Sequence, residues 1–253
     1  MRFRGQKYTL SNETVEFEGH TLRRITYTDE FKRYYEMTRR DRPRSADLSV
    51  GGFIEGAYNL RQDDEAVVTG EAKVFADGQA RDSAIVTDAA VVAGNAGVYG
   101  SALVRGTSRI SEWATVSGHA VVSGNAEICG KATVGQKSKV SGPCRISGYA
   151  MIAGECILDG NVSVEDLAVV DGKARVTPGG HRTEIRGKAR VTGTAVLGAS
   201  ESGTVIDGDM LVDGNVRTGR KAEKARGNRA LSAADAMFGG AAPQAAKSLG
   251  LSR

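Results

Sequence analysis

The sequence predicts an all-β protein whose main part, residues 61–216, is a parallel β-helix, a solenoid of short stacked strands. The first observation is a branched aliphatic residue at every sixth position from Val68 to Val176, interrupted only by Ala80. The second is a small residue, usually alanine, two positions before all of these except Val164, and the third is a glycine that most often follows two positions after. A helix face recurs at 3.6 residues, so this period excludes a helix, whereas the alternation within each hexad is typical of a strand.

Each hexad is expected to form one short strand and one bend. The small and aliphatic residues point inward, and glycine gives the bend the backbone freedom that it needs. Three hexads that close a triangular coil place residues eighteen positions apart above one another, with about 4.8 Å between coils. Val86, Val104 and Val122 then share one column. The six-residue repeat is interrupted twice by three extra residues, at 177–181 and at 199–203. Both insertions are predicted to be small corner loops.

Residues 1–60 do not follow the repeat and are predicted to form a small α+β cap. Strands are expected at 8–10, 15–18 and 22–27, with a turn at 18–20 and a helix over 29–40. The first coil of a solenoid exposes apolar residues and unpaired strand edges, and a cap covers both. The alternative interpretation is a binding surface, because most of the aromatic residues and several basic ones lie here.

The hexads stop at Val216, and residues 217–253 are predicted to form a helical or extended basic arm. The arm has 8 Lys and Arg against 2 Asp and Glu, whereas residues 61–216 have 15 against 19. Such an arm is expected either to be solvated or to dock onto an acidic partner or a symmetry mate. A nucleic acid ranks last among the partners, because no aromatic residues are interleaved with the basic ones.

The composition bounds the remaining classes of protein. No apolar run approaches the roughly 20 residues of a membrane span, and the first residues lead into no signal core, so neither membrane insertion nor export by a signal peptide is expected. The sequence separations between Cys129, Cys144 and Cys156 are not multiples of eighteen, so these residues do not stack above one another and no disulfide is expected. The cysteines and histidines have no metal-site spacing.

The hexads resemble those of the hexapeptide-repeat family, whose members form left-handed parallel β-helices, so the resemblance implies a left-handed coil here. Three further segments carry a closer resemblance: Tyr8-Thr9-Leu10-Ser11-Asn12-Glu13-Thr14, then residues 19–25, then Leu48-Ser49-Val50-Gly51-Gly52-Phe53-Ile54-Glu55. Together with the hexads they are similar, over roughly the first 215 residues, to bacterial and phage proteins named as hexapeptide transferases. The resemblance implies a parallel homotrimer and an association with a phage or prophage; it does not establish a reaction.

Stacking by eighteen predicts two surfaces for contact with other molecules. One outward column is mainly aliphatic where its counterparts on the other two faces are mixed, and it is predicted to be a self-association face. Its apolar members are Val67, Ile85, Leu103, Val121 and Ile157. A corner column contains Trp113, Tyr149 and Leu167, which are expected either to anchor a partner or to pack under the arm or the cap.

Two histidines are candidates for catalysis. Hexapeptide acyltransferases use a histidine as general base while the acyl group leaves coenzyme A, so the resemblance directs attention to His119, beside the aliphatic column, and to His181, in the first insertion. For each of them, an ordinary exposed polar residue is the favoured interpretation. No phosphate-binding loop or nucleophile elbow is present.

These observations favour a non-catalytic trimeric scaffold over an enzyme. It would use no cofactor, it would belong to a phage or prophage-encoded assembly, and its arm would dock onto another protein. The expected location is cytoplasmic or virion-associated. The alternative is an O- or N-acyltransferase that depends on acetyl-coenzyme A or another acyl-coenzyme A and uses His119 or His181.

Overall fold

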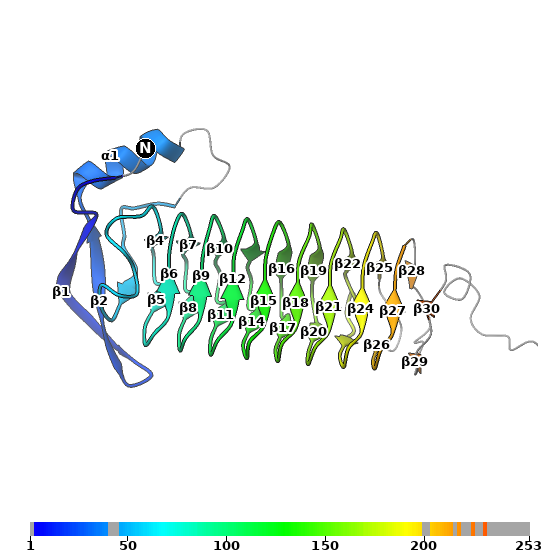
Figure 1. Ribbon diagram of the computed structural model, residues 1–253. Helices are drawn as coiled ribbons and strands as arrows, with labels where there is room; N and C mark the ends of the chain where they lie inside the picture. Colours follow the sequence, from blue (N-terminus) through cyan, green and yellow to red (C-terminus); the bar gives the residue numbers. More distant parts are fainter. Residues whose placement is uncertain are drawn as a thin grey trace, which may run out of the picture.

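The computed structural model describes residues 3–39, 46–198 and 203–214, together with the backbone of three short strands beyond them. It shows a parallel β-solenoid with a hairpin and a helix at its N-terminal end (Figure 1). The prediction of a parallel β-helix is therefore confirmed. The described residues contain a single helix of 11 residues, and it is not long and apolar enough to cross a bilayer.

The solenoid has three faces, each formed by one sheet of stacked parallel strands. Face 1 consists of β4 (Val67–Val68), β7 (Ile85–Val86), β10 (Leu103–Val104), β13 (Val121–Val122), β16 (Lys139–Ser141), β19 (Ile157–Asp159), β22 (Arg175–Val176), β25 (Val196–Leu197) and β28 (Arg217–Thr218). Face 2 consists of β3 (Phe53–Ile54), β5 (Lys73–Val74), β8 (Val91–Val92), β11 (Arg109–Ile110), β14 (Glu127–Ile128), β17 (Arg145–Ile146), β20 (Val162–Val164), β23 (Thr183–Ile185), β26 (Thr204–Ile206) and β29 (Lys224–Ala225). Face 3 consists of β6 (Gln79–Ala80), β9 (Gly97–Val98), β12 (Thr115–Val116), β15 (Thr133–Val134), β18 (Met151–Ile152), β21 (Val169–Val170), β24 (Arg190–Val191), β27 (Leu211–Val212) and β30 (Ala230–Leu231).

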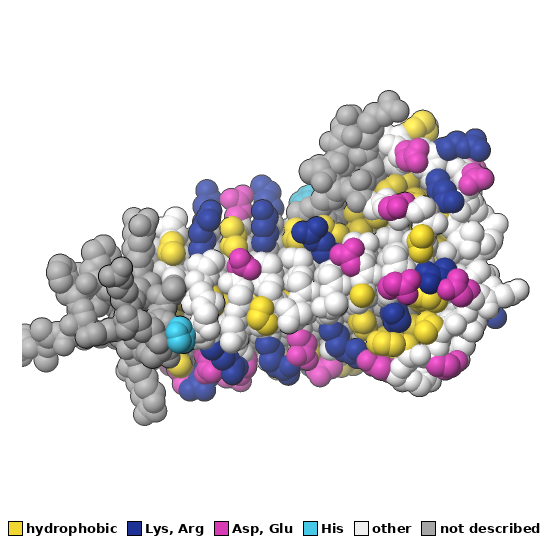
Figure 2. All heavy atoms as spheres, turned by 180° about the vertical axis from the view of Figure 1, so that it is seen from behind, with side chains coloured by type: hydrophobic (Ala, Val, Ile, Leu, Met, Phe, Trp, Pro, Cys, Tyr) yellow, Lys and Arg dark blue, Asp and Glu magenta, His cyan; other side chains and the backbone are white. Residues whose placement is uncertain are grey.

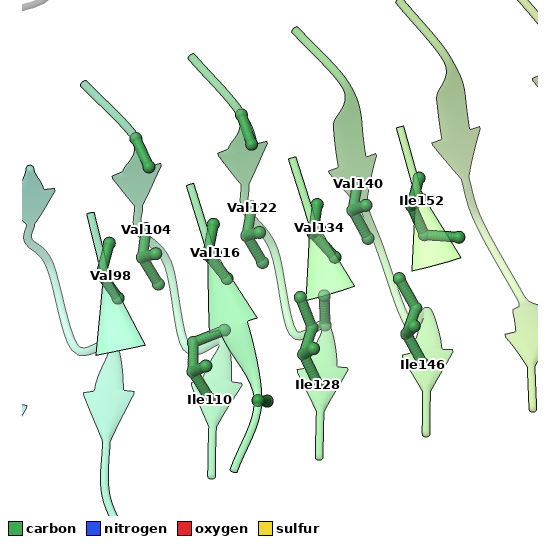
Figure 3. Packing of buried hydrophobic residues seen from close by; sticks show 14 of the residues in the cluster. Val98, Val104, Ile110, Val116, Val122, Ile128, Val134, Val140, Ile146 and Ile152 are labelled. Atoms are coloured by element: carbon green, nitrogen blue, oxygen red, sulfur yellow. The ribbon is translucent and has the colours of Figure 1, made fainter. Parts of the chain in front are cut away.

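The predicted register is confirmed. Val104 pairs with Val86 on one side and with Val122 on the other, and Figure 3 shows such aliphatic columns converging from all three faces. After the first insertion the step becomes 21 residues, as for Val176 and Leu197. The second insertion has the same effect on the step, although its residues 199–202 lie outside the described part of the chain.

At several corners, the position in the left-handed region is occupied by an acidic or amide residue, whereas at other corners it is occupied by glycine. Asp88, for example, has a φ of 60°, and its Oδ2 accepts a hydrogen bond of 2.9 Å from the backbone N–H of Gly106, one coil further on. The same contact to the next coil is made by Asp82, Glu112, Gln136 and Asp166. Left-handed backbone is unfavourable for a side chain with a Cβ. The inter-coil hydrogen bond offsets part of that cost.

The N-terminal block extends the sheet of face 2. Strands β1 (Tyr8–Phe17) and β2 (His20–Tyr27) form an antiparallel hairpin, β2 pairs with β3, and β3 pairs in parallel with β5. Helix α1 (Asp29–Arg39) follows. The hairpin and the helix lie where the sequence predicts them. The two short strands expected within residues 8–18 are one strand with a register shift between Leu10 and Thr14.

Residues 50–60 cover the open end of the first coil. The N–H of Gly52 donates to the carbonyl of Val68 at 2.9 Å, and the N–H of Gly70 donates to the carbonyl of Val50 at 3.0 Å. On face 3, Leu60 forms a parallel bridge with Ala80. The backbone groups of the first strands of the solenoid therefore have partners within the chain, and the edge of the face 2 sheet is moved outward to β1 of the hairpin.

The solenoid continues one coil past Val216, where the sequence predicts that it ends. Strands β28, β29 and β30 pair in parallel with β25, β26 and β27. β29 lies in a segment whose helix propensity favours a helical arm, so tertiary stacking overrides local propensity there. The rest of residues 217–253, with the predicted docking arm, lies outside the described residues.

Candidate functional surfaces

The aliphatic column lies on face 1, but its first two members are not available to a partner. Val67 and Ile85 are buried within the chain itself, in a hydrophobic cluster that also contains Leu48 of the N-terminal block. The prediction that they belong to the self-association face is therefore wrong. The N-terminal block packs against this end of the solenoid, where Nζ of Lys7 donates to the carbonyl of Ala66 at 2.9 Å and the hydroxyl of Tyr27 donates to the carbonyl of Val68 at 3.0 Å. The accessible part of the column begins at Leu103, which is half-buried, and continues with Val121 and Ile157, also half-buried.

Face 2 is polar and carries the tip of the hairpin. Arg109 on β11 forms two hydrogen bonds with Glu18, of 2.6 and 2.7 Å, although the two residues are 91 positions apart. Further along the face, Arg145 forms an ion pair with Glu127. Figure 2 shows basic and acidic side chains following the solenoid, with hydrophobic side chains gathered around the N-terminal block. Exposed pairs of this kind contribute little to stability, so they indicate a solvated face.

The two candidate histidines lie on different corners and do not form one site. His119 is exposed between β12 and β13, at the corner of faces 3 and 1. Further along the same corner, Glu155 forms ion pairs with Lys137 at 3.3 Å and Lys173 at 4.0 Å, so this column is a polar, solvated edge. His181 is exposed between β22 and β23, at the corner of faces 1 and 2.

A third histidine, His20, has a carboxylate partner that the sequence does not predict. Its Nδ1 lies 3.1 Å from Oε1 of Glu55, and Oε2 of Glu55 accepts a hydrogen bond of 2.8 Å from the N–H of Ala76. The hydrogen bond from His20 is the main cause that lowers the pKa of Glu55. The His20 ring also packs on Phe75, with centroids 4.9 Å apart. The pair joins the hairpin to the first coil, and the only sequence signal for it is that Glu55 ends the Gly-Gly-Phe-Ile-Glu segment.

That segment is explained by close packing at the junction. A Cβ on Gly51 would lie 2.0 Å from the carbonyl oxygen of Ile25, and one on Gly52 would lie 2.7 Å from the carbonyl oxygen of Ala72. Asn59, which is fully buried, donates to the carbonyls of Ala76 at 2.9 Å and Gly78 at 2.8 Å. The motif behind the closer resemblance is thus a structural joint between the N-terminal block and the solenoid.

The corner of faces 2 and 3 exposes the largest side chains of the solenoid. Trp113 and Tyr149 are each 60% exposed and Leu167 is 52% exposed, so the N-terminal block does not cover them. Between the two aromatic residues, the Nζ of Lys131 lies 5.3 Å from the centroid of the Tyr149 ring. The corner lies across the triangular coil from face 1.

The cysteines are buried thiols. Cys129, Cys144 and Cys156 are all free, and burial raises the pKa of Cys144 and of Cys156 to about 11. Such thiols hold little of the reactive thiolate at neutral pH. Within the described part of the chain, no group of three or more His, Cys, Asp or Glu side chains could hold a metal ion.

Comparison with known proteins adds no identification, since no family model matches the chain and no curated protein has a significantly similar sequence. The function must therefore be inferred from the surfaces described above.

Proposed function

We propose that this protein is a non-catalytic scaffold that forms a parallel homotrimer through face 1. The observation that supports the proposal is the column of Leu103, Val121 and Ile157, interrupted by Lys139 between the last two, on the outside of a ladder whose backbone is hydrogen-bonded from coil to coil. Aliphatic side chains in register on an outer face are typical of an interface. Within this proposal, the trimer is a component of a phage or prophage-encoded particle, and residues 217–253 dock another protein.

The shape of the coil constrains how such a trimer closes. A ring of three needs a heterologous contact, in which each subunit meets its two neighbours in directions about 60° apart. In a triangular coil, a face and an adjacent corner are separated by this angle. Face 1 of one subunit would therefore pack against a corner that borders face 1 of the next. The corner of faces 2 and 3 would point away from the threefold axis.

The Leu103→Glu, Val121→Glu double variant is expected to be monomeric, because each carboxylate would be buried without a partner at the contact. Light scattering measures the mass directly. Thr115→Glu with Thr133→Glu provides a matched control, since these residues lie on face 3 in the same two coils, and this variant should keep the mass of the parent. An unchanged mass for the face 1 variant would contradict the proposed interface.

The acyltransferase alternative is favoured by one observation, the exposed position of His119 at a corner that borders face 1. In the proposed trimer a corner of this kind lies at the subunit contact. If the protein is a scaffold, acetyl-coenzyme A at about 1 mM should leave the unfolding temperature unchanged, because only a ligand that binds the folded state stabilises it. A rise of several degrees, together with acyl transfer that is lost in His119→Ala, would favour the enzyme instead.

A further inference from the structure

Four exposed side chains follow one another along the corner of faces 2 and 3. The N–H of Trp113 donates to the carbonyl of Gly130 at 2.8 Å, and the N–H of Lys131 donates to the carbonyl of Gly148 at 2.6 Å, so Trp113, Lys131 and Tyr149 occupy successive coils. Leu167 follows in the next coil. The spacing is that of paired strands, about 4.8 Å, which separates Trp113 from Tyr149 by about 10 Å. We call these four residues the ridge.

The ridge combines ring faces with an available positive charge. Lys131 contacts the Tyr149 ring, and no carboxylate oxygen of the described residues lies within 4.0 Å of its Nζ. Two carboxylates border the ridge and keep their charge, but each hydrogen-bonds to the backbone of the next coil: Glu112 accepts from the N–H of Gly130 at 2.7 Å, and Asp166 accepts from the N–H of Gly187 at 3.0 Å. Lys188 follows in the next coil and is also exposed. The ridge therefore offers the ammonium group of Lys131, which has no ion-pair partner among the described residues, to a negatively charged group of a ligand.

The shape of the ridge disfavours a globular protein as the ligand. A stable protein interface buries about 800 Å² on each partner and has a well-packed centre. The ridge is convex and is centred on one residue per coil, with Met151 of face 3 as its exposed apolar border. A linear polymer can instead lie along the corner and contact every coil. In an extended glycan, the length of one pyranose unit along the chain is close to the spacing between two successive coils.

We propose that the ridge binds a linear, β-linked acidic polysaccharide with about one sugar unit per coil. Trp113 and Tyr149 stack on the apolar faces of alternate sugars, because an aromatic ring offers a large, flat contact with little conformational entropy to lose. Lys131 pairs with the carboxylate of the sugar between them. Leu167 extends the apolar contact to the next unit.

The site is independent of the proposed trimer and compatible with it. The ridge lies across the coil from face 1, so a trimer formed through face 1 leaves all three ridges accessible. Three parallel ridges could engage one polysaccharide network together and raise the apparent affinity. A single chain retains the whole site, because all four side chains come from the same subunit.

The experiment uses Trp113 as its own reporter, since it is the only tryptophan in the chain. A hexamer of β-1,4-linked mannuronic acid is titrated into the full-length protein, and cellohexaose is the uncharged probe. The acidic hexamer is expected to change the tryptophan fluorescence saturably. Tyr149→Ala and Lys131→Gln should each weaken binding about tenfold, a loss that corresponds to about 1.4 kcal/mol. Met37→Ala, a change at an exposed residue of α1, is the control and should bind like the parent.

Each other outcome overturns the assignment. The ridge is not a glycan site if neither hexasaccharide changes the fluorescence at concentrations up to about 10 mM, where even weak binding is detected. Equal affinity for cellohexaose, or no effect of Lys131→Gln, excludes a site for an acidic glycan. Capture of a protein that depends on Trp113, without any response to glycans, assigns the ridge to a protein partner. The Leu103→Glu, Val121→Glu variant should still bind the hexamer, which separates this test from that of the trimer.

Discussion

Replacing Gly51 with alanine is expected to detach the N-terminal block from the first coil. The added methyl group would lie 2.0 Å from the carbonyl oxygen of Ile25, which belongs to the backbone and cannot rotate away. Relief of this overlap would move β2 away from the segment that follows Leu48. It would also break the hydrogen bond of 2.8 Å from the N–H of Ile25 to the carbonyl of Gly52. Overpacking a filled site typically costs about 1–3 kcal/mol and costs more against rigid backbone.

Hydrogen exchange measures this detachment residue by residue. In Gly51→Ala the amides of Ile25, Gly52 and Gly70 should lose their protection, while amides in coils beyond Val122 should exchange as in the parent, because a solenoid couples mainly nearest neighbours. The exposed edge of the first coil should also promote association between chains. Gly180→Ala is the control, since a Cβ at Gly180 has no neighbour within 4 Å. Equal protection in both variants would contradict the role assigned to Gly51.

The solenoid could be predicted from the sequence because its determinants are local and periodic. Every coil repeats the same inward alanine and aliphatic residue, so the pattern that marks one strand also fixes the register of the next, as for Val86, Val104 and Val122. The insertion at 177–181 was equally readable, because it interrupts a repeat that resumes unchanged. The coil of β28 to β30 lacks that pattern. Its strands form on the template of the preceding coil, which residue types alone do not reveal.

The contacts of the N-terminal block could not be predicted, because they join residues with no periodic relation. His20 meets Glu55 across 35 positions, and Glu18 meets Arg109 across 91. The burial of Ile85 has the same origin. Periodicity assigned its side chain correctly to the outside of face 1, but it carries no information about which other segment covers that face.

The candidate surfaces divide in the same way. Counting by eighteen placed Trp113 and Tyr149 on one exposed corner and Leu103 and Val121 on one face, and the structure places them there. The same counting separates His119 from His181, which lie on different corners. The availability of Lys131 was not predictable, because it depends on acidic neighbours that bind backbone amides of the next coil.

Raising the pH from about 8 to 10.5 is expected to lower the free energy of unfolding, chiefly through Cys144 and Cys156. Burial raises the pKa of each thiol from 9.0 to about 11. The unfolded chain therefore releases these protons near pH 9, while the folded chain keeps them until about pH 11. Fewer protons bound to the unfolded state mean that stability falls as the pH rises through this window. Each thiol can lower the free energy of unfolding by at most about 3 kcal/mol, because a shift of one pKa unit corresponds to about 1.4 kcal/mol.

Other buried groups modify this loss at higher pH. Burial also raises the pKa of Cys129 and of Tyr27, and both shifts add a loss of the same sign. Burial raises the pKa of Tyr8 from 10.0 to about 12, which adds a loss of the same sign above pH 10. Burial lowers the pKa of Lys7 below 10.5 despite its ion pair of 2.8 Å with Asp64. The unfolded chain then keeps the Lys7 proton longer than the folded chain does. Stability gained from Lys7 as the pH approaches 10.5 offsets part of the loss from the thiols.

The Cys144→Ala, Cys156→Ala variant isolates the contribution of the thiols. Alanine occupies the same inward position in most hexads, so the variant should fold, and its stability should fall by several kcal/mol less than that of the parent between pH 8 and 10.5. Denaturant unfolding at the two pH values measures the difference. Ser138→Ala is the control, because Ser138 is buried in an equivalent position and does not titrate in this range. If the double variant and the parent lose stability equally, the alkaline loss arises elsewhere, and the thiols are not the groups that hold their protons against the rising pH.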